Sequence, residues 1–418
     1  CRAPGLSIQA DCVALTRGFG PGYLDTIPER KLHSVSTELG ESPRPMLIRS
    51  DCRHCRLDRP CTPHKQRGVK CEGCDTYDPV EYRILLIKLG AMGDVLRTTA
   101  LLPAIRAKHP RSHLTWIVDP KSREILEGLP GIDRLWILDA GVLPQVQVEH
   151  FDWVINLDLS AESLALATLA QAEQKSGYGL TPQGTVRCWN PEAEAYLAMS
   201  YWDDLKKQNT KTYQQLMLDL IGSDAVAGEI QVAIPPTELE YAQAFSRKQP
   251  IAPERPGVGL NLGAGGRWRW KRWTPEGFLD LARRLWEAHR ANLLILSGPD
   301  EAELKADWLR QCKVPVVDAR HDNSYGRFAA LVNLCEVVVT GDTLALHLAL
   351  ALRKRVVALV GPTSKAEIEL YGRGVALSGD VPCLGCYLPE CDVRPSCMES
   401  LSSETVFSAV ERLLERKE

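Results

Sequence analysis

One aspartate stands where an apolar strand turns into a helix. Residues 84–99 read ILLIKLGAMGDVLRTT, so Gly90 and Gly93 fall in the turn and Asp94 follows at the helix start. Glycines let the backbone approach a ligand, and a helix start offers unpaired N–H groups. A carboxylate there repels phosphate but suits accepting a proton from a hydroxyl, with a simple helix cap as the alternative. We predict Asp94 as a general base beside an acceptor-side loop.

A second glycine turn is strongly basic. Residues 260–273 read LNLGAGGRWRWKRW, in which Gly263 opens a loop and Arg267 and Lys271 precede a helix starting near Thr274. Glycines, cations and a helix N-terminus at one place favour a diphosphate. A solvated basic edge and single-stranded nucleic acid are the alternatives. The net charge of −3, from 50 basic and 53 acidic residues, disfavours nucleic acid.

The same order of strand, turn and helix start occurs in residues 338–363, where a predicted strand is followed by Gly-Asp-Thr. Asp342 and Thr343 fall at a helix N-terminus, where a hydroxyl and an amide can meet phosphate. His347 lies four residues after Thr343 and therefore on the same helical face. An ordinary buried helix histidine is the alternative, but we favour a cleft-lining role.

Fourteen cysteines are present, and most of them form two clusters. The first has the spacing of a zinc site, C-x2-C…C-x2-C, with one surplus thiol. We expect Cys52, Cys71 and Cys74 to bind a metal, with Cys55 or Cys61 as the fourth ligand. The second cluster comprises Cys383, Cys386, Cys391 and Cys397. We predict structural zinc or iron at both, with unligated thiols as the alternative, and a reducing, cytoplasmic location.

The elements that must position these residues alternate between short apolar strands and amphipathic helices. Such alternation predicts an α/β protein with two doubly wound, Rossmann-like lobes and a cleft between them. No run of about 18 apolar residues occurs, so no membrane-spanning helix is expected. The predicted parts are a poorly ordered leader (1–50), a cysteine-rich metal-binding segment (51–80), an acceptor-binding lobe (81–250) and a nucleotide-sugar-binding lobe with a cysteine finger and final helix (251–418).

From about Tyr82 to the C-terminus the chain resembles glycosyltransferase family nine, the ADP-heptose:lipopolysaccharide heptosyltransferases. The resemblance rests on the motifs of residues 84–99, 260–273, 297–301 (SGPDE) and 338–363, in that order. It implies a fold of the GT-B type and an inverting transfer of heptose from an ADP-sugar. Leu344 replaces the glycine of the family's Asp-Thr-Gly motif, which predicts a narrower donor site.

The resemblance also implies residue roles. Asp94 corresponds to the catalytic base and Lys271 to the donor-phosphate lysine, while Glu301 is the expected nucleoside partner. The donor-binding set is then Gly263, Arg267, Lys271, Glu301, Asp342, Thr343 and His347. No catalytic divalent metal is expected, because protein cations and helix N-termini stabilise the leaving diphosphate.

The implied partners are an ADP-heptose-type donor and a glycolipid acceptor, with at most peripheral contact with the inner face of the cytoplasmic membrane. The acceptor is expected in the lipopolysaccharide core or another surface glycan. A heptosyltransferase acting on protein is the alternative within the same chemistry, and a zinc-dependent nucleic-acid-binding protein is the alternative from another class.

Overall fold

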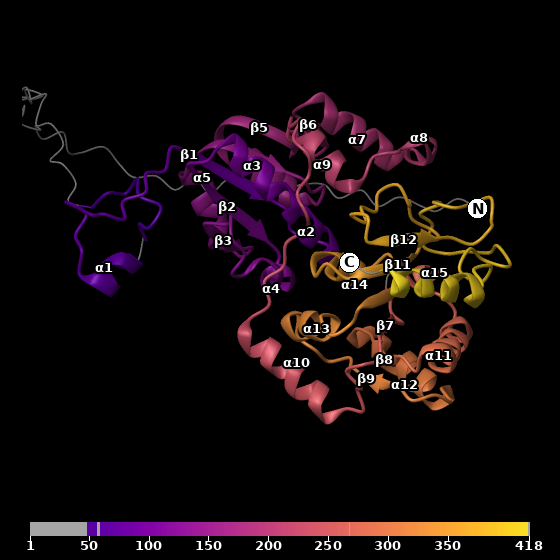
Figure 1. Ribbon diagram of the computed structural model, residues 1–418. Coiled ribbons are helices and arrows are strands. Elements are labelled where there is room, and N and C mark those ends of the chain that lie inside the picture. Colours follow the sequence, from indigo (N-terminus) through magenta and orange to yellow (C-terminus); the bar gives the residue numbers. More distant parts are fainter. Residues whose placement is uncertain (1–47, 57–58, 267, 417–418) are drawn as a thin grey trace, which may run out of the picture. The chain divides into compact units, whose positions relative to one another are not determined.

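The apolar runs of the sequence form two six-stranded sheets in the computed structural model (Figure 1). The structure describes residues 48–56, 59–266 and 268–416, so the predicted leader 1–50 lies almost wholly outside the described residues. The described residues from 49 to 416 form one compact unit, which contains both sheets. We call the part built on the first sheet the N-terminal lobe and the part built on the second the C-terminal lobe.

The N-terminal sheet has the strand order β3-β2-β1-β4-β5-β6, parallel except for the last pair. Its strands are β1 (Tyr82–Ile87), β2 (Ser112–Val118), β3 (Arg134–Ile137), β4 (His150–Asn156), β5 (Gln171–Leu180) and β6 (Val186–Cys188). The helices are α2 (Met92–Thr98), η1 (Thr99–Leu101), α3 (Leu102–Lys108), η2 (Pro120–Ser122), α4 (Arg123–Leu126), α5 (Val142–Val148), α6 (Ala161–Leu169), α7 (Pro191–Tyr201), α8 (Asp203–Gln208) and α9 (Tyr213–Leu220).

The C-terminal sheet repeats the order as β12-β11-β10-β7-β8-β9, with every pair parallel. Its strands are β7 (Gly257–Asn261), β8 (Asn292–Leu296), β9 (Val317–Asp318), β10 (Val337–Gly341), β11 (Arg355–Leu359) and β12 (Gly374–Leu377). The helices are α10 (Pro236–Lys248), which precedes the sheet, then η3 (Arg269–Lys271), α11 (Pro275–His289), η4 (Pro299–Glu301), α12 (Ala302–Gln311), α13 (Tyr325–Val332), α14 (Leu344–Ala351) and α15 (Ser403–Glu415).

Both sheets have a topological switch point, where the strand order reverses. In the N-terminal lobe it lies between β1 and β4, and in the C-terminal lobe between β7 and β10. Ligands of open α/β sheets bind outside the carboxyl ends of the strands at such points. The turn with Gly90 follows β1, the turn with Gly263 follows β7, and Asp342 follows β10. Three of the four chemical motifs of the sequence therefore lie at switch points.

Three elements differ from what the pattern of apolar residues predicts. The pattern predicts one helix over 94–108, but the structure has three pieces, because Pro103 lies at the start of α3 and cannot continue the backbone hydrogen bonds of a preceding helix. The apolar run at 314–317 predicts a strand, and the structure has the two-residue β9, Val317–Asp318. The final helix is predicted over 404–416, and α15 begins and ends one residue earlier.

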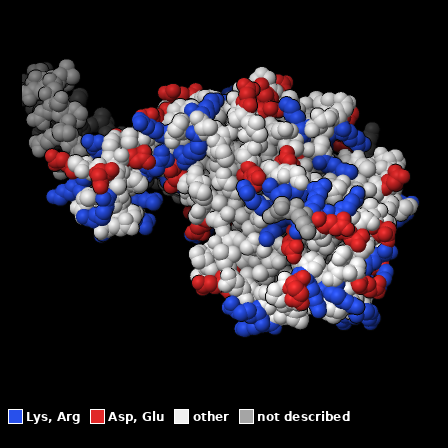
Figure 2. All heavy atoms as spheres, in the orientation of Figure 1, with Lys and Arg blue, Asp and Glu red and all other residues white. Residues whose placement is uncertain are grey.

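The cysteine-rich segment contains one short helix, α1 (Thr62–Arg67), and is fastened to the N-terminal sheet by an arginine. Arg53 donates to Asp133, just before β3, at 2.6 Å and to the carbonyl oxygen of Ser112, at the start of β2, at 2.8 Å. Among the described residues no helix is both long and apolar enough to cross a membrane. On the face shown in Figure 2, basic and acidic side chains are interspersed.

Candidate active site

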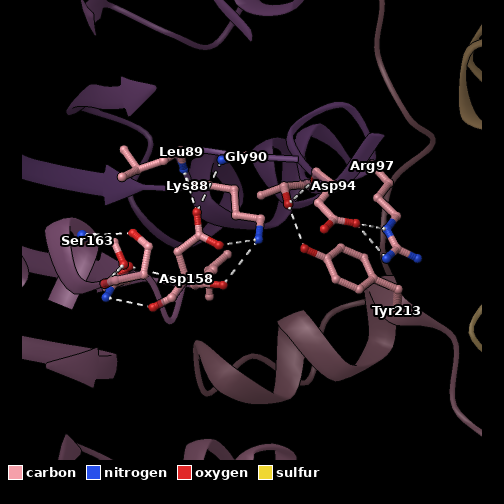
Figure 3. Close-up of polar contacts among 12 residues, drawn as sticks. Lys88, Leu89, Gly90, Asp94, Arg97, Asp158, Ser163 and Tyr213 are labelled. Atoms are coloured by element: carbon pink, nitrogen blue, oxygen red, sulfur yellow. Dashed lines mark hydrogen bonds and ion pairs between the residues drawn. The ribbon is translucent and has the colours of Figure 1, made fainter. Parts of the chain in front are cut away.

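Asp94 is paired with an arginine of its own helix. In α2, Oδ1 of Asp94 accepts hydrogen bonds from Arg97 at 2.7 Å (Nη2) and 3.0 Å (Nε), as Figure 3 shows. The guanidinium of Arg97 in turn stacks on the ring of Tyr213, 3.7 Å from its centre. The Asp94 side chain keeps 34% of its surface exposed, against 14% for Arg97. The carboxylate is thus oriented by a buried cation and still open on one side.

The charge state of Asp94 follows from this pairing. Burial, the largest single effect, would raise the pKa of Asp94. The charges of Arg97 and Lys88 together lower it by more than burial raises it, so the net pKa lies below the ordinary value of an aspartate. Asp94 is therefore a carboxylate at neutral pH. It can accept a proton or a hydrogen bond from a hydroxyl, and it has no proton of its own to donate.

A buried ion pair fixes the turn that carries Asp94. Nζ of Lys88 lies 2.8 Å from Oδ1 of Asp158, which follows β4 on the other side of the switch point. Oδ2 of Asp158 accepts from the amides of Leu89 (2.7 Å) and Gly90 (3.3 Å) (Figure 3). The Gly90 amide is therefore already paired within the protein. Asp158 instead lines a cavity of about 560 Å³ beside this turn, together with Asp119 and Glu162.

The C-terminal lobe supplies the opposing cation. Nζ of Lys271 lies 2.9 Å from Oδ2 of Asp342, and Nε2 of His347 lies 3.7 Å from Oδ1 of the same carboxylate. Burial alone would raise the pKa of Asp342, but Lys271, His347 and Arg97 outweigh it, so the net pKa is well below its usual range. Burial, followed by Arg97, lowers the pKa of His347 to about 4, so the imidazole is neutral at pH 7.

The N-terminus of α14 presents donors to a cavity. The amides of Leu344 and Ala345 donate to no group within the described part of the chain, and both residues line the cavity. Thr343 lies at the N-cap, where its Oγ1 is 3.1 Å from Oγ1 of Thr340 and 3.4 Å from Nδ2 of Asn261. A helix N-terminus of this kind, with Lys271 beside Asp342, suits a diphosphate.

Glu301 organises the basic glycine turn. Its carboxylate is 3% exposed and accepts from the amides of Ala264 (3.2 Å) and Gly265 (2.8 Å), with Arg272 3.6 Å away. A Cβ on Gly263 would lie 2.6 Å from this carboxylate, which explains the glycine. These amides are not free for phosphate, contrary to what the glycines alone suggested. Arg267, predicted to bind the donor, lies outside the described residues.

The two lobes meet at α2 and α14 (Figure 1). A Cβ on Gly93 would lie 3.2 Å from Cδ2 of His347 and 3.8 Å from the Cα of Leu344, so a glycine lets the two helices come this close. A cavity of about 470 Å³ opens beside the contact. Its lining includes Gly93 from the N-terminal lobe and Glu301, Thr343 and Leu344 from the C-terminal lobe. The structure thus brings the Asp94 helix beside the predicted donor residues.

Four residues of this site did not enter the sequence-based prediction. They are Lys88, Arg97, Asp158 and Tyr213. Arg97 had a signal, because an acidic and a basic residue three positions apart on a helix are neighbours. The pairing of Lys88 with Asp158, 70 residues apart, had none.

The cysteines of each cluster lie near one another. Burial and then the neighbouring thiols of Cys52, Cys71 and Cys61 raise the pKa of Cys55. Cys74 faces Thr76 instead, with Sγ 3.2 Å from Oγ1. In the second cluster, burial and the thiols of Cys386, Cys391 and Cys383 raise the pKa of Cys397 to about 11. Within residues 48–56, 59–266 and 268–416, no three His, Cys, Asp or Glu side chains are close enough to hold a metal as they stand.

Comparison with known proteins gives consistent matches. A sequence model of glycosyltransferase family 9 (heptosyltransferase) matches residues 143–393. Lipopolysaccharide heptosyltransferase 2 of Escherichia coli is 24% identical over 312 residues, which are 68% of this chain and 83% of that protein. A family 9 glycosyl transferase structure from Veillonella parvula has a TM-score of 0.65 at 21% identity, covering 80% of this chain and 97% of that one. The E. coli heptosyltransferase WaaC, solved with ADP, has a TM-score of 0.52 at 19% identity, covering 80% and 98%.

Proposed function

This chain belongs to glycosyltransferase family 9, the heptosyltransferases, and from that premise we propose that it transfers a heptose from an ADP-sugar to an acceptor of the lipopolysaccharide core. One observation carries the proposal. The carboxylate of Asp94 on one lobe and the Lys271–Asp342 pair and α14 N-terminus on the other lie around the contact of α2 with α14. A base and a diphosphate site on opposite sides of a cleft are what glycosyl transfer requires.

The residues of the C-terminal lobe indicate where the sugar nucleotide would bind. A diphosphate next to Lys271 competes with Asp342 for the ammonium group, and the amides of Leu344 and Ala345 supply further donors. The nucleoside would occupy the cavity beside Glu301 and Tyr325. A relative solved with ADP supports the choice of an adenine nucleotide.

The chemistry is a single displacement. The acceptor hydroxyl oxygen attacks the anomeric carbon, while the bond from that carbon to the diphosphate oxygen breaks and the nucleotide leaves with the electron pair. The hydroxyl proton passes to the carboxylate of Asp94. Lys271 and the α14 N-terminus stabilise the charge that develops on the leaving oxygen. Attack from the side opposite the leaving group inverts the anomeric configuration.

Calorimetric titration with ADP, UDP and GDP tests the donor half. We expect ADP to bind most tightly and Lys271→Ala to weaken its binding at least tenfold, because a charged hydrogen bond contributes about 1.5–3 kcal/mol and the unpaired Asp342 would repel the diphosphate. Lys313→Ala, at an exposed site, is the matched control. A preference for UDP or GDP would change the sugar nucleotide, and no nucleotide binding would refute the proposal.

An ADP-heptose transfer assay tests the acceptor half. Asp94→Asn keeps the size and hydrogen-bonding reach of the side chain but removes the negative charge that takes up the proton. We expect transfer to fall by roughly 10²–10⁴ while ADP affinity stays within about twofold, because the donor residues belong to the other lobe. Normal turnover by Asp94→Asn would show that another group is the base.

The cysteine clusters are proposed as structural metal sites. Each cluster concentrates the soft thiol donors that zinc and iron prefer, with Cys55 influenced by Cys52, Cys61 and Cys71, and Cys397 by Cys383, Cys386 and Cys391. The described thiols would have to close around the ion, because no three of them are near enough as they stand. In the first cluster the proposed ligands are Cys52, Cys71 and Cys74, with Cys55 or Cys61 as the fourth. The metals take no part in the transfer step.

The metal content of the purified protein distinguishes structural metal sites from unligated thiols. We expect about two equivalents of zinc or iron per chain by elemental mass spectrometry after purification without chelator. Cys71→Ser should lower the content by about one equivalent, whereas Cys188→Ser, outside both clusters, should not change it. Metal-free protein with reactive thiols would refute the proposal.

A cytoplasmic location and a peripheral contact with the membrane are also proposed. All twelve cysteines in the described part of the chain are free, which fits a reducing compartment such as the cytoplasm. A lipid-linked acceptor would bring the protein to the inner face of the cytoplasmic membrane. Sedimentation with vesicles that carry the acceptor, compared with vesicles that lack it, tests this contact.

A further inference from the structure

A second cavity lies apart from the donor cavity. Its volume is about 370 Å³, and it shares none of the lining residues of the donor cavity. Its walls come from α8 and the residue Asn209 after it, from the turn that follows β11, from Ser378 after β12 and from the loop between Cys383 and Cys391. The loop is held to the turn by backbone hydrogen bonds from Gly385 to Gly361 (3.0 Å) and from Tyr387 to Pro362 (2.8 Å).

Three lysines give the cavity a positive charge. They are Lys206, Lys207 and Lys365, and no aspartate or glutamate is among the lining residues. Lys206 lies 4.1 Å from the centre of the Tyr387 ring, and its nearest carboxylate oxygen, on Asp203, is 3.8 Å away. Lys207 and Lys365 have no ionic or hydrogen-bonding partner for their ammonium groups in the described part of the chain. With one carboxylate near Lys206 and none in contact with the other two lysines among the described residues, the lining keeps a net positive charge, which attracts an anion.

The floor of the cavity holds two hydroxyls without partners. Thr363 is 7% exposed, and its Oγ1 is buried with no hydrogen-bond partner among the described residues. Oγ of Ser378 is in the same condition. A buried hydroxyl without a partner costs about 1–3 kcal/mol. Thr363 and Ser378 thus contribute to the lining two hydroxyls that a hydrogen bond to an anionic oxygen would satisfy.

The cavity is linked to the reaction centre by direct contacts. The hydroxyl of Tyr387 is bonded to Oε1 of Glu367 at 3.0 Å, and the carbonyl oxygen of Glu367 accepts from the amide of Tyr213 at 3.1 Å. The ring of Tyr213 stacks against the guanidinium of Arg97, which forms the ion pair with Asp94. The wall of the cavity is thus connected to the residues that orient Asp94.

We propose that this lysine cavity binds a phosphate group carried by the acceptor saccharide. The inference deepens the proposed function and depends on it, since it assigns the cavity to the acceptor. A phosphate monoester carries close to two negative charges and three acceptor oxygens, which matches three ammonium groups and adjacent hydroxyls. A carboxylate is the weaker match, because its planar pair of oxygens is best met by arginine, and no arginine lines the cavity.

The test uses the full chain saturated with ADP, so that the donor site is closed to other anions. Glucose 6-phosphate and inorganic phosphate are titrated by calorimetry, with glucose as the uncharged and glucuronate as the carboxylate comparison. We expect both phosphates to bind and glucose not to bind. Glucuronate binding as tightly as glucose 6-phosphate would overturn the choice of phosphate.

Variants assign the binding to the cavity. Lys207→Gln combined with Lys365→Gln changes two exposed side chains and should weaken phosphate binding at least tenfold. Thr363→Val, of nearly the same shape, should weaken it several-fold, and Lys313→Gln should not change it. Phosphate binding that survives the double substitution would overturn the proposal.

The same titrations keep this proposal separate from the proposed function. If ADP fails to bind, the proposed function fails, and the phosphate titration is then repeated without ADP. If ADP binds normally and neither phosphate binds, only the lysine cavity is refuted. The double variant should retain wild-type ADP affinity, because the two lysines lie outside the donor cavity.

Discussion

The pairing of Asp94 with Arg97 sets what the carboxylate can do. A carboxylate bonded to a guanidinium is well oriented and remains ionised, but the same bond makes it a weaker base. One of its oxygens, Oδ1, takes both hydrogen bonds from Arg97. The other oxygen is the one available to an acceptor hydroxyl. Arg97 thus orients the carboxylate of Asp94 and at the same time makes it a weaker base.

Replacing Arg97 should change the pH dependence of transfer. Transfer needs ionised Asp94, whose pKa is held low by Arg97 and Lys88 against the opposing effect of burial. In Arg97→Gln the pKa of Asp94 rises, so the acid limb of kcat moves to higher pH. We expect kcat near neutral pH to fall about tenfold through lost orientation.

Arg97→Lys is the control for this experiment, because it keeps the positive charge and loses only the forked geometry. Its acid limb should stay close to that of the wild type. An acid limb that does not move in Arg97→Gln would contradict the assignment of Asp94 as the titrating base.

At the residue scale, the sequence indicated Asp94 and Asp342 because each stands where a strand turns into a helix. It indicated Lys271 from the basic glycine turn and His347 from the helical face that it shares with Thr343. It could not indicate that Lys271 and Asp342, 71 residues apart, form an ion pair. The role of Glu301 was also out of reach, since its partners are backbone amides of a distant turn. Contacts of this kind depend on how strands are ordered in the sheet.

At the scale of elements, the contact of α2 with α14 is the point where the lobes meet closely. Gly93→Ala should disturb it, because the new Cβ would lie 3.2 Å from Cδ2 of His347. We expect a loss of about 1–3 kcal/mol in the free energy of unfolding, as for other overpacked interiors. Thermal and urea unfolding measure it.

A double-substitution cycle identifies the cause. In a His347→Ala background the added methyl group has space, so Gly93→Ala should cost much less there than in the wild type. An equal cost in both backgrounds would show that the destabilisation arises within α2 itself and not from the approach of α14.

The elements that the sequence did not predict share a physical reason. β5 (Gln171–Leu180) begins with the polar residues QAEQKS, and its first half is largely exposed, so it lacks the apolar run of a buried strand. β12 is half-buried at the edge of its sheet. The buried strands β1, β7 and β10 were predicted because their sequences are almost entirely apolar.

At the scale of the whole molecule, two histidines should make stability depend on pH. Burial, the largest cause in each case, lowers the pKa of His113 and of His347 to about 4. The unfolded chain takes up protons at these histidines near pH 6.5, whereas the folded chain does so only near pH 4. Stability should therefore fall as pH falls from 6.5 to 4, by up to roughly 3 kcal/mol for His347.

Urea unfolding at pH 7 and pH 5 measures this loss, and His347→Gln should reduce it. Glu367 opposes this loss of stability. Burial raises its pKa, so the folded chain binds a proton at Glu367 more readily than the unfolded chain does, and this contribution to stability increases as the pH falls. A stability that stays constant between pH 7 and pH 5 in the wild type would contradict the neutral, buried state of the two histidines.

The two lobes must also be held in register, since the base belongs to one and the donor site to the other. The segment between α9 and α10 does this. Its residue Gly228 donates to Ala100 of the N-terminal lobe at 3.0 Å. The next residue, Glu229, binds Arg373 of the C-terminal lobe through two hydrogen bonds of 3.0 and 3.1 Å, and Arg353 at 3.3 Å.

Glu229→Gln should therefore separate donor binding from catalysis. The ADP site is built from the C-terminal lobe, so ADP affinity should stay within about twofold. Transfer needs Asp94 to be placed correctly across the cleft, where small displacements of the reacting groups are costly, so we expect kcat to fall about three- to tenfold. Lys211→Gln, which breaks the exposed pair with Asp219 within the N-terminal lobe, is the control. A proportional loss of ADP affinity and kcat in Glu229→Gln would mean that the ion pair supports the C-terminal lobe itself and not the alignment of the two lobes.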